Sequence, residues 1–493
     1  MPGDIRTNVF PFTNYFNRTA PISNFTSNGS LPISRIDDMA IRIMTPYFYL
    51  GQDQNYPARD PSMGIINTLW PQGSYRYNFM ETGQPSVDVR ENHADLVRTM
   101  GAQSATLLKN VKGALPLRAP KSLGVFGSDA ADSTSGLYNF QEEDIGVLPI
   151  GGGSGAARFT YIVSPLEAIK QRASQDRTLV QYITNNTVAA SGISVPGIYP
   201  IPEACVVFLK TYVAEAVDRV SYDVDDNGNA VVEAVAATCN NTIVVTHSGG
   251  INTMPWADNE NVTAIIAAHF PGQEVGSAIV DVLYGDVNPS GHLPYTIAYN
   301  ESDYNTAITN ATGVNETNAW QSNFWEGLMI DYRHFDAANI TPRYEFGFGL
   351  SYTNFSLSGL QSSVTAMNVS SMPPAQSGPT PPGGAVSLYE VLMTVNATIA
   401  NTGAVAGAAV VQLYLAPPQG SVPEGTPPQA LRGFEKVFLQ PNASAPVGFA
   451  ITRRDLSYWD TTTQQWSIPA GQFGVMVGFS SRDQPLRSSV TVV

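Results

Sequence analysis

Cysteine, histidine and basic residues are all scarce in this chain of 493 residues. It has two cysteines, five histidines, and 26 Lys and Arg against 41 Asp and Glu, which gives a formal net charge of -15. Two cysteines exclude a multi-disulfide framework, and histidines without HxxxH or Cys/His spacing predict no metal site. The negative charge repels nucleic acids and anionic lipids. A neutral, polyhydroxylated partner is therefore expected.

Long hydrophobic runs are also absent. The composition is 43% hydrophobic and 14% charged, as in globular proteins, and no run of eighteen apolar residues could span a bilayer. The length predicts roughly three structural units. The first residues, MPGDIRTNVF, lack the charged-then-apolar pattern of a signal peptide.

N-glycosylation triplets, in contrast, are far more frequent than the roughly five expected by chance. This excess favours a secreted glycoprotein, and a missing signal peptide then fits a chain whose front is absent. The two cysteines, Cys205 and Cys239, could form one bridge after secretion or remain two buried thiols. The triplets start at Asn17, Asn24, Asn28, Asn185, Asn240, Asn261, Asn300, Asn310, Asn315, Asn339, Asn354, Asn368, Asn396 and Asn442.

The first hundred residues hold one predicted helix and one irregular segment. In residues 31–50, Ser34 is the expected N-cap, Asp37 and Asp38 fall in the expected first turn, and Pro46 is expected to end or kink the helix. The Gly-, Pro- and Asn-rich segment that follows has little periodicity and indicates a linker.

From about residue 89 the pattern changes to alternating strands and helices. The clearest helix, at 273–284, repeats apolar residues at i, i+3, i+4 and i+7. This alternation predicts a mainly parallel α/β sheet with helices on both faces, whose ligands gather at the carboxyl ends of the strands. The expected strands lie at 123–126, 179–183, 205–209, 242–245 and 262–268.

The last hundred residues have strand periodicity instead. Apolar residues alternate with polar ones from Val391 to Ile399 and again from Phe473 to Phe479, with turn signals between the runs. This spacing predicts an all-β sandwich. A Pro/Ser/Gly-rich stretch at 361–386 precedes it and indicates a linker.

Five segments in the same order closely resemble landmarks of glycoside hydrolase family 3, the β-glucosidases. The most specific are GGGSGAARFTYIVSPLEAI, HFPGQEVGSAIVDVLYGDVNPSGHLPYT and the DYRHFD and FGFGLSYT segments near residues 331–352. The tetrapeptide Met1-Pro2-Gly3-Asp4 resembles one that lies shortly after the family's catalytic nucleophile. The resemblance therefore implies the back portion of such an enzyme, without most of its catalytic barrel.

The resemblance also implies the division of the chain. It gives a mainly parallel (α/β)6-type sandwich and a fibronectin type III-like β-sandwich, preceded by a remnant of a (β/α)8 barrel. The expected segments are a barrel remnant at 1–50, a linker at 51–88, the α/β sandwich at 89–356, a linker at 357–386 and the β-sandwich at 387–493.

Retaining glycosidases need two carboxyl groups, a nucleophile and an acid/base. In the family the nucleophile is an Asp of the barrel, and Asp4 lies after its position, so no nucleophile is expected in this chain. The segment FLKTYVAEAVDR resembles the loop that lends the acid/base, which makes Glu215 the candidate. Where the family has glycine, this chain has Ala216, which puts the loop geometry in question. A surface Glu without a role is the alternative.

The glycine run at 151–155 has two interpretations. Serial backbone amides can cradle phosphate, but no Lys-Ser/Thr follows and no GxGxxG occurs on a strand-helix turn, so a nucleotide site is not predicted. By resemblance, Ser154 is a substrate-binding residue that hydrogen-bonds the glycosyl unit, whereas a plain glycine hinge is the alternative. Near the end of the α/β region, Asp331, Arg333 and Asp336 indicate either a ligand cluster or a buried Asp-Arg pair that locks a loop.

The sequence thus predicts a secreted β-glucosidase-like hydrolase that cleaves terminal β-D-glucosyl residues without cofactors and is inactive as this chain alone. Its partners would be a β-glucoside or oligosaccharide substrate and N-linked glycans, with no nucleic acid, membrane or metal. A β-xylosidase of the same family and a non-catalytic secreted module that binds carbohydrate or protein are the alternatives.

Overall fold

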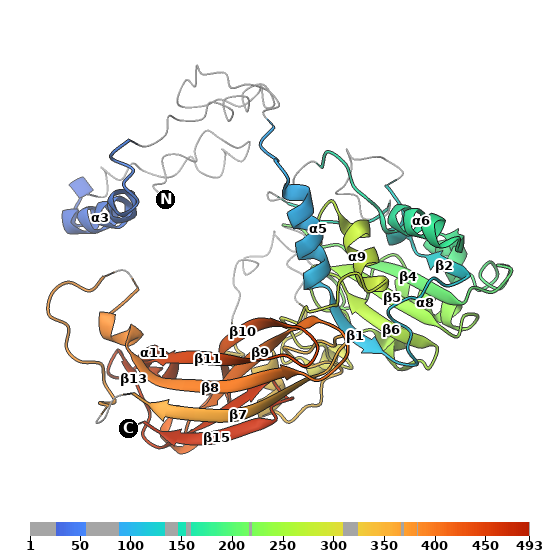
Figure 1. Ribbon diagram of the computed structural model, residues 1–493. Coiled ribbons are helices and arrows are strands. Elements are labelled where there is room, and N and C mark those ends of the chain that lie inside the picture. Colours follow the sequence, from blue (N-terminus) through green and yellow to red (C-terminus); the bar gives the residue numbers. More distant parts are fainter. Residues whose placement is uncertain are drawn as a thin grey trace. The chain divides into compact units, whose positions relative to one another are not determined.

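The computed structural model contains two compact units, Met1–Glu91 and Asn92–Val493 (Figure 1). In the first unit, helix α3 (Ile33–Tyr49) is the main described element. The structure describes residues 26–55, 88–133, 146–153, 159–215, 219–308, 324–365, 369–381 and 383–492.

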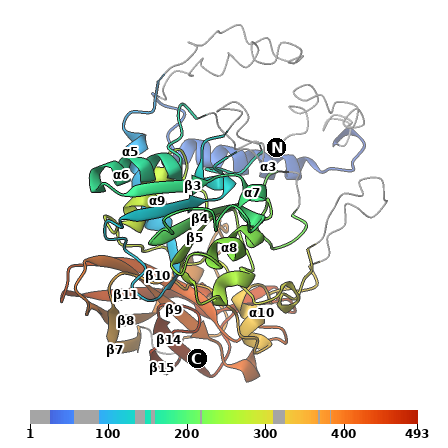
Figure 2. The same ribbon diagram turned by 90° about the vertical axis from the view of Figure 1, so that its right-hand side faces the viewer.

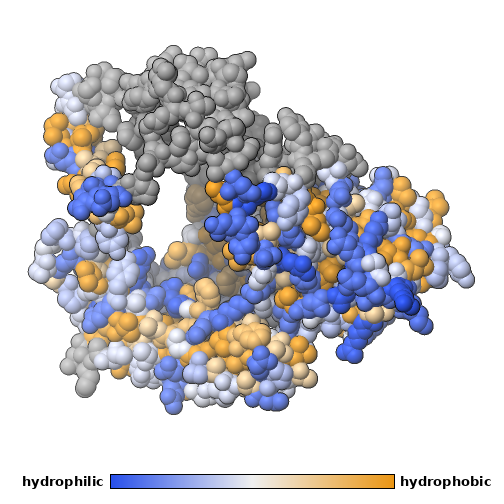
Figure 3. Space-filling view, turned by 45° about the horizontal axis from the view of Figure 1, so that its top comes forward, coloured by the Kyte–Doolittle hydropathy of each residue, from blue (hydrophilic) through white to orange (hydrophobic). Residues whose placement is uncertain are grey.

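Helix α3 begins and continues differently from the prediction. Its N-cap is Pro32 without a side-chain cap hydrogen bond, so the Ser34 cap is wrong, and no acidic residue lies in its first turn. Pro46 lies inside the helix, which ends three residues later. A proline removes one hydrogen bond near the end of a helix, and the last turn here still closes through the Leu50 N–H, which donates to Pro46 O at 3.0 Å. No residue of α3 is buried, and Ile41 and Phe48 are among its exposed hydrophobic side chains. Hydrophobic residues, coloured orange, are visible on the described surface in Figure 3.

The second unit begins with a six-stranded sheet of order β1-β6-β5-β4-β2-β3. Strands β2 to β6 are parallel and confirm the five predicted strands, whereas β1 (Thr106–Asn110) pairs antiparallel with β6 and was not predicted. The parallel strands are β2 (Ser122–Phe126), β3 (Leu179–Ile183), β4 (Ala204–Thr211), β5 (Thr242–Ser248) and β6 (Val262–Ala267).

Helices cover both faces of this sheet, as predicted (Figures 1 and 2). Val206 and Phe208 of β4 share one core with helices α5, α6 and α9, whereas Val207 and Leu209 share the other with α7 and α8. Burial on both faces explains why the central strands are continuous apolar runs. The helices are α5 (His93–Ser104), α6 (Pro165–Asp176), α7 (Asn186–Ala190), α8 (Gly228–Ala236) and α9 (Val275–Leu283).

A β-sandwich follows, with sheets of order β10-β9-β14-β15 and β11-β8-β7. Val395, Ile399 and Val475 are fully buried between the sheets, which confirms the predicted alternation. The linker expected at 357–386 is partly wrong, because β7 (Phe355–Val364) pairs with β8. The other strands are β8 (Val391–Asn401), β9 (Gly407–Ala416), β10 (Ala430–Leu439), β11 (Ser444–Thr452), β14 (Gln472–Gly478) and β15 (Leu486–Thr491).

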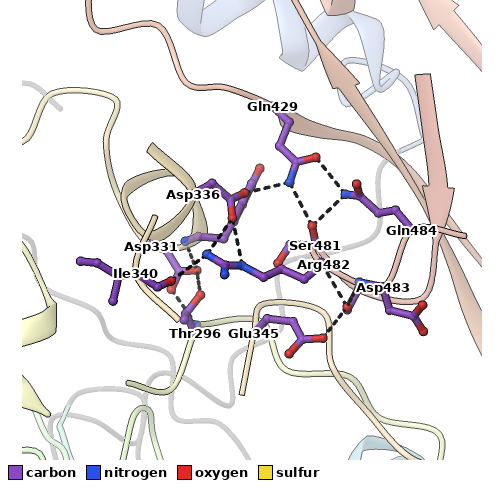
Figure 4. A network of polar contacts seen from close by, with 12 residues as sticks. Thr296, Asp331, Asp336, Ile340, Glu345, Gln429, Ser481, Arg482, Asp483 and Gln484 are labelled. Carbon is purple, nitrogen blue, oxygen red and sulfur yellow. Dashed lines mark hydrogen bonds and ion pairs between the residues drawn. The ribbon is translucent and has the colours of Figure 1, made fainter. Parts of the chain in front are cut away.

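A polar network joins the α/β half to the sandwich (Figure 4). Asp336, in helix α10 (Tyr332–Ala337), pairs with Arg482 at 3.1 Å and accepts a hydrogen bond from Gln429 Nε2 at 2.8 Å. Asp331 instead caps α10 and accepts from Thr296 Oγ1 at 2.7 Å. The predicted Asp-Arg pair therefore exists, but its arginine comes from the sandwich and is not Arg333.

Aromatic packing and an amide reinforce this junction, called the seam below. Tyr332 packs edge to face on the buried Tyr414, with ring centroids 5.9 Å apart. Gln412 Nε2 donates to Gly347 O at 3.0 Å and to Phe479 O at 2.6 Å. A Cβ on Gly347, whose φ is +82°, would lie 2.2 Å from Gln412 Oε1, so the contact requires glycine there.

The two cysteines form a disulfide. Cys205 starts β4, Cys239 follows α8, and the bond closes a loop of 34 residues. It ties the start of β4 to the helix layer on one face of the sheet.

Removing this disulfide is expected to lower the free energy of unfolding by about 4 kcal/mol, because a loop of this length then regains its conformational freedom in the unfolded chain. Urea unfolding of Cys205→Ala/Cys239→Ala measures the loss. Reductant should destabilise the wild-type chain and leave the double variant unchanged. Equal effects of reductant on both would contradict the prediction.

Candidate active site

The loop that follows β4 carries Glu215 at the carboxyl end of the parallel sheet. β4 lies in the middle of the sheet, between β5 and β2. The Gly152 N–H donates to Val213 O at 2.9 Å, and Gly152 forms a parallel bridge with Ala214. Glu215 follows this bridge and is exposed. The structure thus brings the predicted carboxyl group beside the predicted glycine run.

Close backbone approach explains the glycines of this run. A Cβ on Gly152 would lie 2.0 Å from Tyr212 Oη, and one on Gly153 would lie 2.6 Å from Glu215 Cβ and 3.3 Å from Glu215 Oε2. Gly153 also has φ +105°, which L side chains rarely adopt. The Gly152 amide is bonded to Val213, so this part of the run holds the Glu215 loop. The next residue, Ser154, lies outside the described residues, as does Ala216.

A buried Asp-His contact is bonded to the segment that precedes this glycine run. Asp129, just after β2, contacts His247 Nδ1 of β5 at 2.6 Å, and both side chains are fully buried. Its other oxygen accepts from the Leu148 N–H at 2.9 Å. Burial raises the pKa of Asp129, and the contact with His247 opposes that rise. Lys210 of β4 is also buried and donates to Gly146 O at 3.1 Å. These groups fix the segment that leads into the glycine run.

The other side of the Glu215 loop is fixed by Asp225. Its carboxylate accepts from the Tyr212 N–H at 2.6 Å, and its own N–H donates to Lys210 O at 3.0 Å. Burial raises the pKa of Asp225, a rise that the Tyr212 hydrogen bond and Arg219 oppose. Arg219 donates to Ile251 O at 2.6 Å. The backbone that leads into Glu215 is therefore bonded to neighbouring segments, and the Arg219 side chain anchors the chain at residue 219.

The sequence predicted Glu215 and the glycine run as site residues but gave no role to Asp129, His247, Lys210 or Asp225, which hold the surrounding segments. One usable signal was position, because Asp129 and His247 stand at the carboxyl ends of two predicted parallel strands. Within the described ranges, no group of three or more His, Cys, Asp or Glu side chains is placed to hold a metal ion.

His269, after β6, gives the second unit a pH dependence. Its Nε2 lies 2.9 Å from Tyr295 Oη, and burial lowers its pKa from 6.5 to about 4. The unfolded chain therefore binds more protons than the folded chain between these pH values. Stability from this group is complete above about pH 6.5 and is lost as the pH falls towards 4, by up to about 3 kcal/mol.

The variant His269→Asn, which tolerates the local φ of +56°, is expected to remove this contribution. Urea unfolding at a series of pH values should show wild type and variant diverging as the pH rises from 4 to 6.5. Parallel curves over that window would refute the assignment. Subtracting the variant's stability curve from the wild-type curve cancels the contributions of carboxylates, which titrate in both proteins.

The arrangement supplies one exposed carboxyl group on a tightly bonded loop. Such a group can give a proton to a leaving oxygen and later take one from water, which are the two tasks of a glycosidase acid/base. A hydrolase of the double-displacement type needs a second carboxylate about 5 Å away. Glu215 can supply one of the two carboxyl groups that this chemistry needs.

Comparisons with known proteins place the chain in a family. Residues 105–352 match the glycosyl hydrolase family 3 C-terminal domain, and residues 409–481 match a fibronectin type III-like domain. The chain belongs to glycoside hydrolase family 3, and the fold predicted for its α/β and β-sandwich parts is confirmed.

The individual relatives are fungal β-glucosidases. The chain is 54% identical to "Probable beta-glucosidase G" of Aspergillus flavus over 95% of its own length and 57% of the relative's. It resembles the solved β-D-glucoside glucohydrolase of Trichoderma reesei, with 40% identity and a TM-score of 0.80. The β-glucosidase D2-BGL of Chaetomella raphigera gives 38% identity and the same TM-score. The chain spans 62% of each solved protein and 57% of the Aspergillus protein. In the part of the chain that the structure describes, no helix is long and apolar enough to cross a membrane.

Proposed function

We propose that this chain supplies the acid/base half of a retaining β-glucosidase that acts on terminal β-D-glucosyl residues. One observation carries the proposal: the glycine run is hydrogen-bonded to the loop that presents Glu215 at the carboxyl end of β4, within a family 3 domain. The names of the relatives support a β-glucoside as the substrate.

The chemistry assigns two proton transfers to Glu215. In the first step its carboxyl proton moves to the glycosidic oxygen as the bond from C1 to that oxygen breaks and a carboxylate nucleophile bonds to C1. In the second step the Glu215 carboxylate takes a proton from water as the water oxygen bonds to C1 and the glycosyl ester breaks. No residue of this chain is assigned the nucleophile, and Ser154 is assigned a hydrogen bond to the sugar.

The proposal extends to the division and the location of the protein. We assign 1–50 to a barrel remnant, 51–88 to a linker and 89–356 to the α/β domain, with the sandwich including β7 and continuing to the end.

Secretion with N-linked glycans is supported by the disulfide and by exposed asparagines at 240, 300, 339 and 442. A fall in mass after enzymatic removal of N-glycans from protein secreted by a fungal expression host tests this assignment.

Two proteins test the activity: the chain itself, and a chimera that joins it to the portion of the Aspergillus flavus relative that it does not match. We expect the chimera to hydrolyse 4-nitrophenyl β-D-glucoside with a higher kcat/KM than the β-D-xyloside, and the chain alone to give no turnover. Turnover by the chain alone would show that it holds its own nucleophile. Preference for the xyloside would favour a β-xylosidase, and a folded chimera inactive on both would contradict a catalytic role.

A further inference from the structure

A cavity of about 650 Å³ lies on the sandwich, under a loop of the α/β half. Residues 325–329 and Arg333 form one wall, and strands and loops between 415 and 473 form the others. Its volume is in the range of small-molecule sites. None of its lining residues belongs to the glycine run or to the Glu215 loop.

Five aromatic rings contribute to the lining. Trp459 and Trp466 face each other across the hairpin of β12 (Tyr458–Asp460) and β13 (Gln465–Ser467), with ring centroids 5.6 Å apart at 71°. Trp325, Tyr458 and Phe473 are the other aromatic residues of the lining. The Trp325 side chain is 88% exposed and Trp459 is 43% exposed. Tryptophans with so much free surface in one cavity are typical of binding sites, since both rings leave apolar area uncovered.

The charged groups of the cavity are nearly balanced. Three carboxylates and two guanidinium groups line it, and Arg432 Nε donates to Asp455 O at 2.8 Å. A ligand with a full charge therefore gains little electrostatic binding free energy here. The lining is better suited to a neutral ligand. Carboxylates accept hydrogen bonds from paired hydroxyl groups and guanidinium groups donate to them. The carboxylates are those of Glu326, Glu424 and Asp455, and the guanidinium groups are those of Arg333 and Arg432.

We propose that this cavity is a second carbohydrate site, which binds a neutral β-linked glucan chain without cleaving it. Pyranose rings with equatorial hydroxyl groups have apolar faces that stack on Trp325 and Trp459, and their hydroxyl edges meet the carboxylates and arginines. The site itself is inferred from the cavity and not from the role of Glu215, whereas the choice of a β-linked chain rests on the proposed function. The site would hold a glucan on the sandwich of a protein that acts on glucosides.

Isothermal titration of the chain with cellotetraose tests the site, with maltotetraose as the α-linked comparison. We expect cellotetraose to bind, and Trp325→Ala and Trp459→Ala each to weaken binding roughly tenfold or more. Trp325 is so exposed that its removal should leave folding intact, which thermal unfolding checks. Phe438→Ala removes an exposed aromatic ring of the same sandwich outside the cavity and should bind as wild type.

Four prolines, Pro417, Pro423, Pro427 and Pro469, also line the cavity, so a proline-rich peptide is the rival occupant. Binding of a decaproline peptide without binding of cellotetraose would overturn the proposal. Absence of heat with about 10 mM cellotetraose, or equal binding by wild type and both tryptophan variants, would also overturn it. Wild-type binding that persists in an inactive chimera would reject the β-glucosidase assignment and leave this site standing.

Discussion

In the active chimera, Glu215→Gln is expected to lower kcat for phenyl β-D-glucoside by about 10²–10⁴-fold, because the amide cannot protonate the departing phenoxide. With 2,4-dinitrophenyl β-D-glucoside, whose leaving group needs no proton, formation of the glycosyl-enzyme should stay close to the wild-type rate. Hydrolysis of that intermediate should become slow, since no base activates water. Stopped-flow and steady-state kinetics on both substrates measure the two effects.

Azide gives the diagnostic readout for the acid/base role. It attacks C1 without general-base help, so it should restore turnover of the dinitrophenyl substrate by the variant and yield β-D-glucosyl azide. A residue that only supports the fold would give no such rescue. Glu233→Gln, which changes an exposed carboxyl on α8, should behave as wild type. Unaltered hydrolysis of phenyl β-D-glucoside by the Glu215 variant would remove Glu215 from the mechanism.

The second large effect is expected at Gly127, the residue after β2. Its φ is +101°, and a Cβ there would lie 2.0 Å from the carbonyl oxygen of Phe208 in the middle of β4. Because the Phe208 oxygen belongs to the backbone, no side-chain rotation can relieve this clash. Gly127→Ala should cost about 3–5 kcal/mol of unfolding free energy, from the strained φ together with the displaced strand. That is a large share of the roughly 5–15 kcal/mol typical of a native protein.

Gly113→Ala is the matched control. Gly113 also has a positive φ, of +67°, but no atom lies within 4 Å of the added Cβ. Its loss should be about 1 kcal/mol, which is the cost of the backbone conformation alone. Urea unfolding of both variants separates the clash from the strain. Equal losses for the two glycines would mean that β4 moves away without cost.

The periodicity of the chain predicted most of the second unit. The parallel strands are apolar on both faces and alternate along the chain with amphipathic helices. This pattern predicts that both faces of the strands are buried. Strand β1 was missed because TLLKN follows helix α5 after only one residue, with no turn signal between them. Strand β7 was missed because its residues are half-buried or exposed, so Ser, Gly and Gln are frequent in it.

The site was predicted less completely, for a physical reason. Glu215 and the glycine run were found through resemblance, whereas the groups that hold them are single residues scattered over 120 positions. Asp129 and His247 are 118 residues apart and meet only because β2 and β5 end at the same edge of the sheet. Arg482 lies beyond the whole α/β region, so a local pattern around Asp336 could not name it.

The seam makes the sandwich part of the structural support of the α/β region. A protein cut after residue 352 would deprive Tyr332 of its contact with the Tyr414 ring and Asp336 of the Arg482 counter-charge. The α/β region should then be insoluble by itself, and calorimetry of the intact chain should record residues 92–493 melting in one step. A chimera that joins the α/β region to another catalytic barrel should therefore include the sandwich as well.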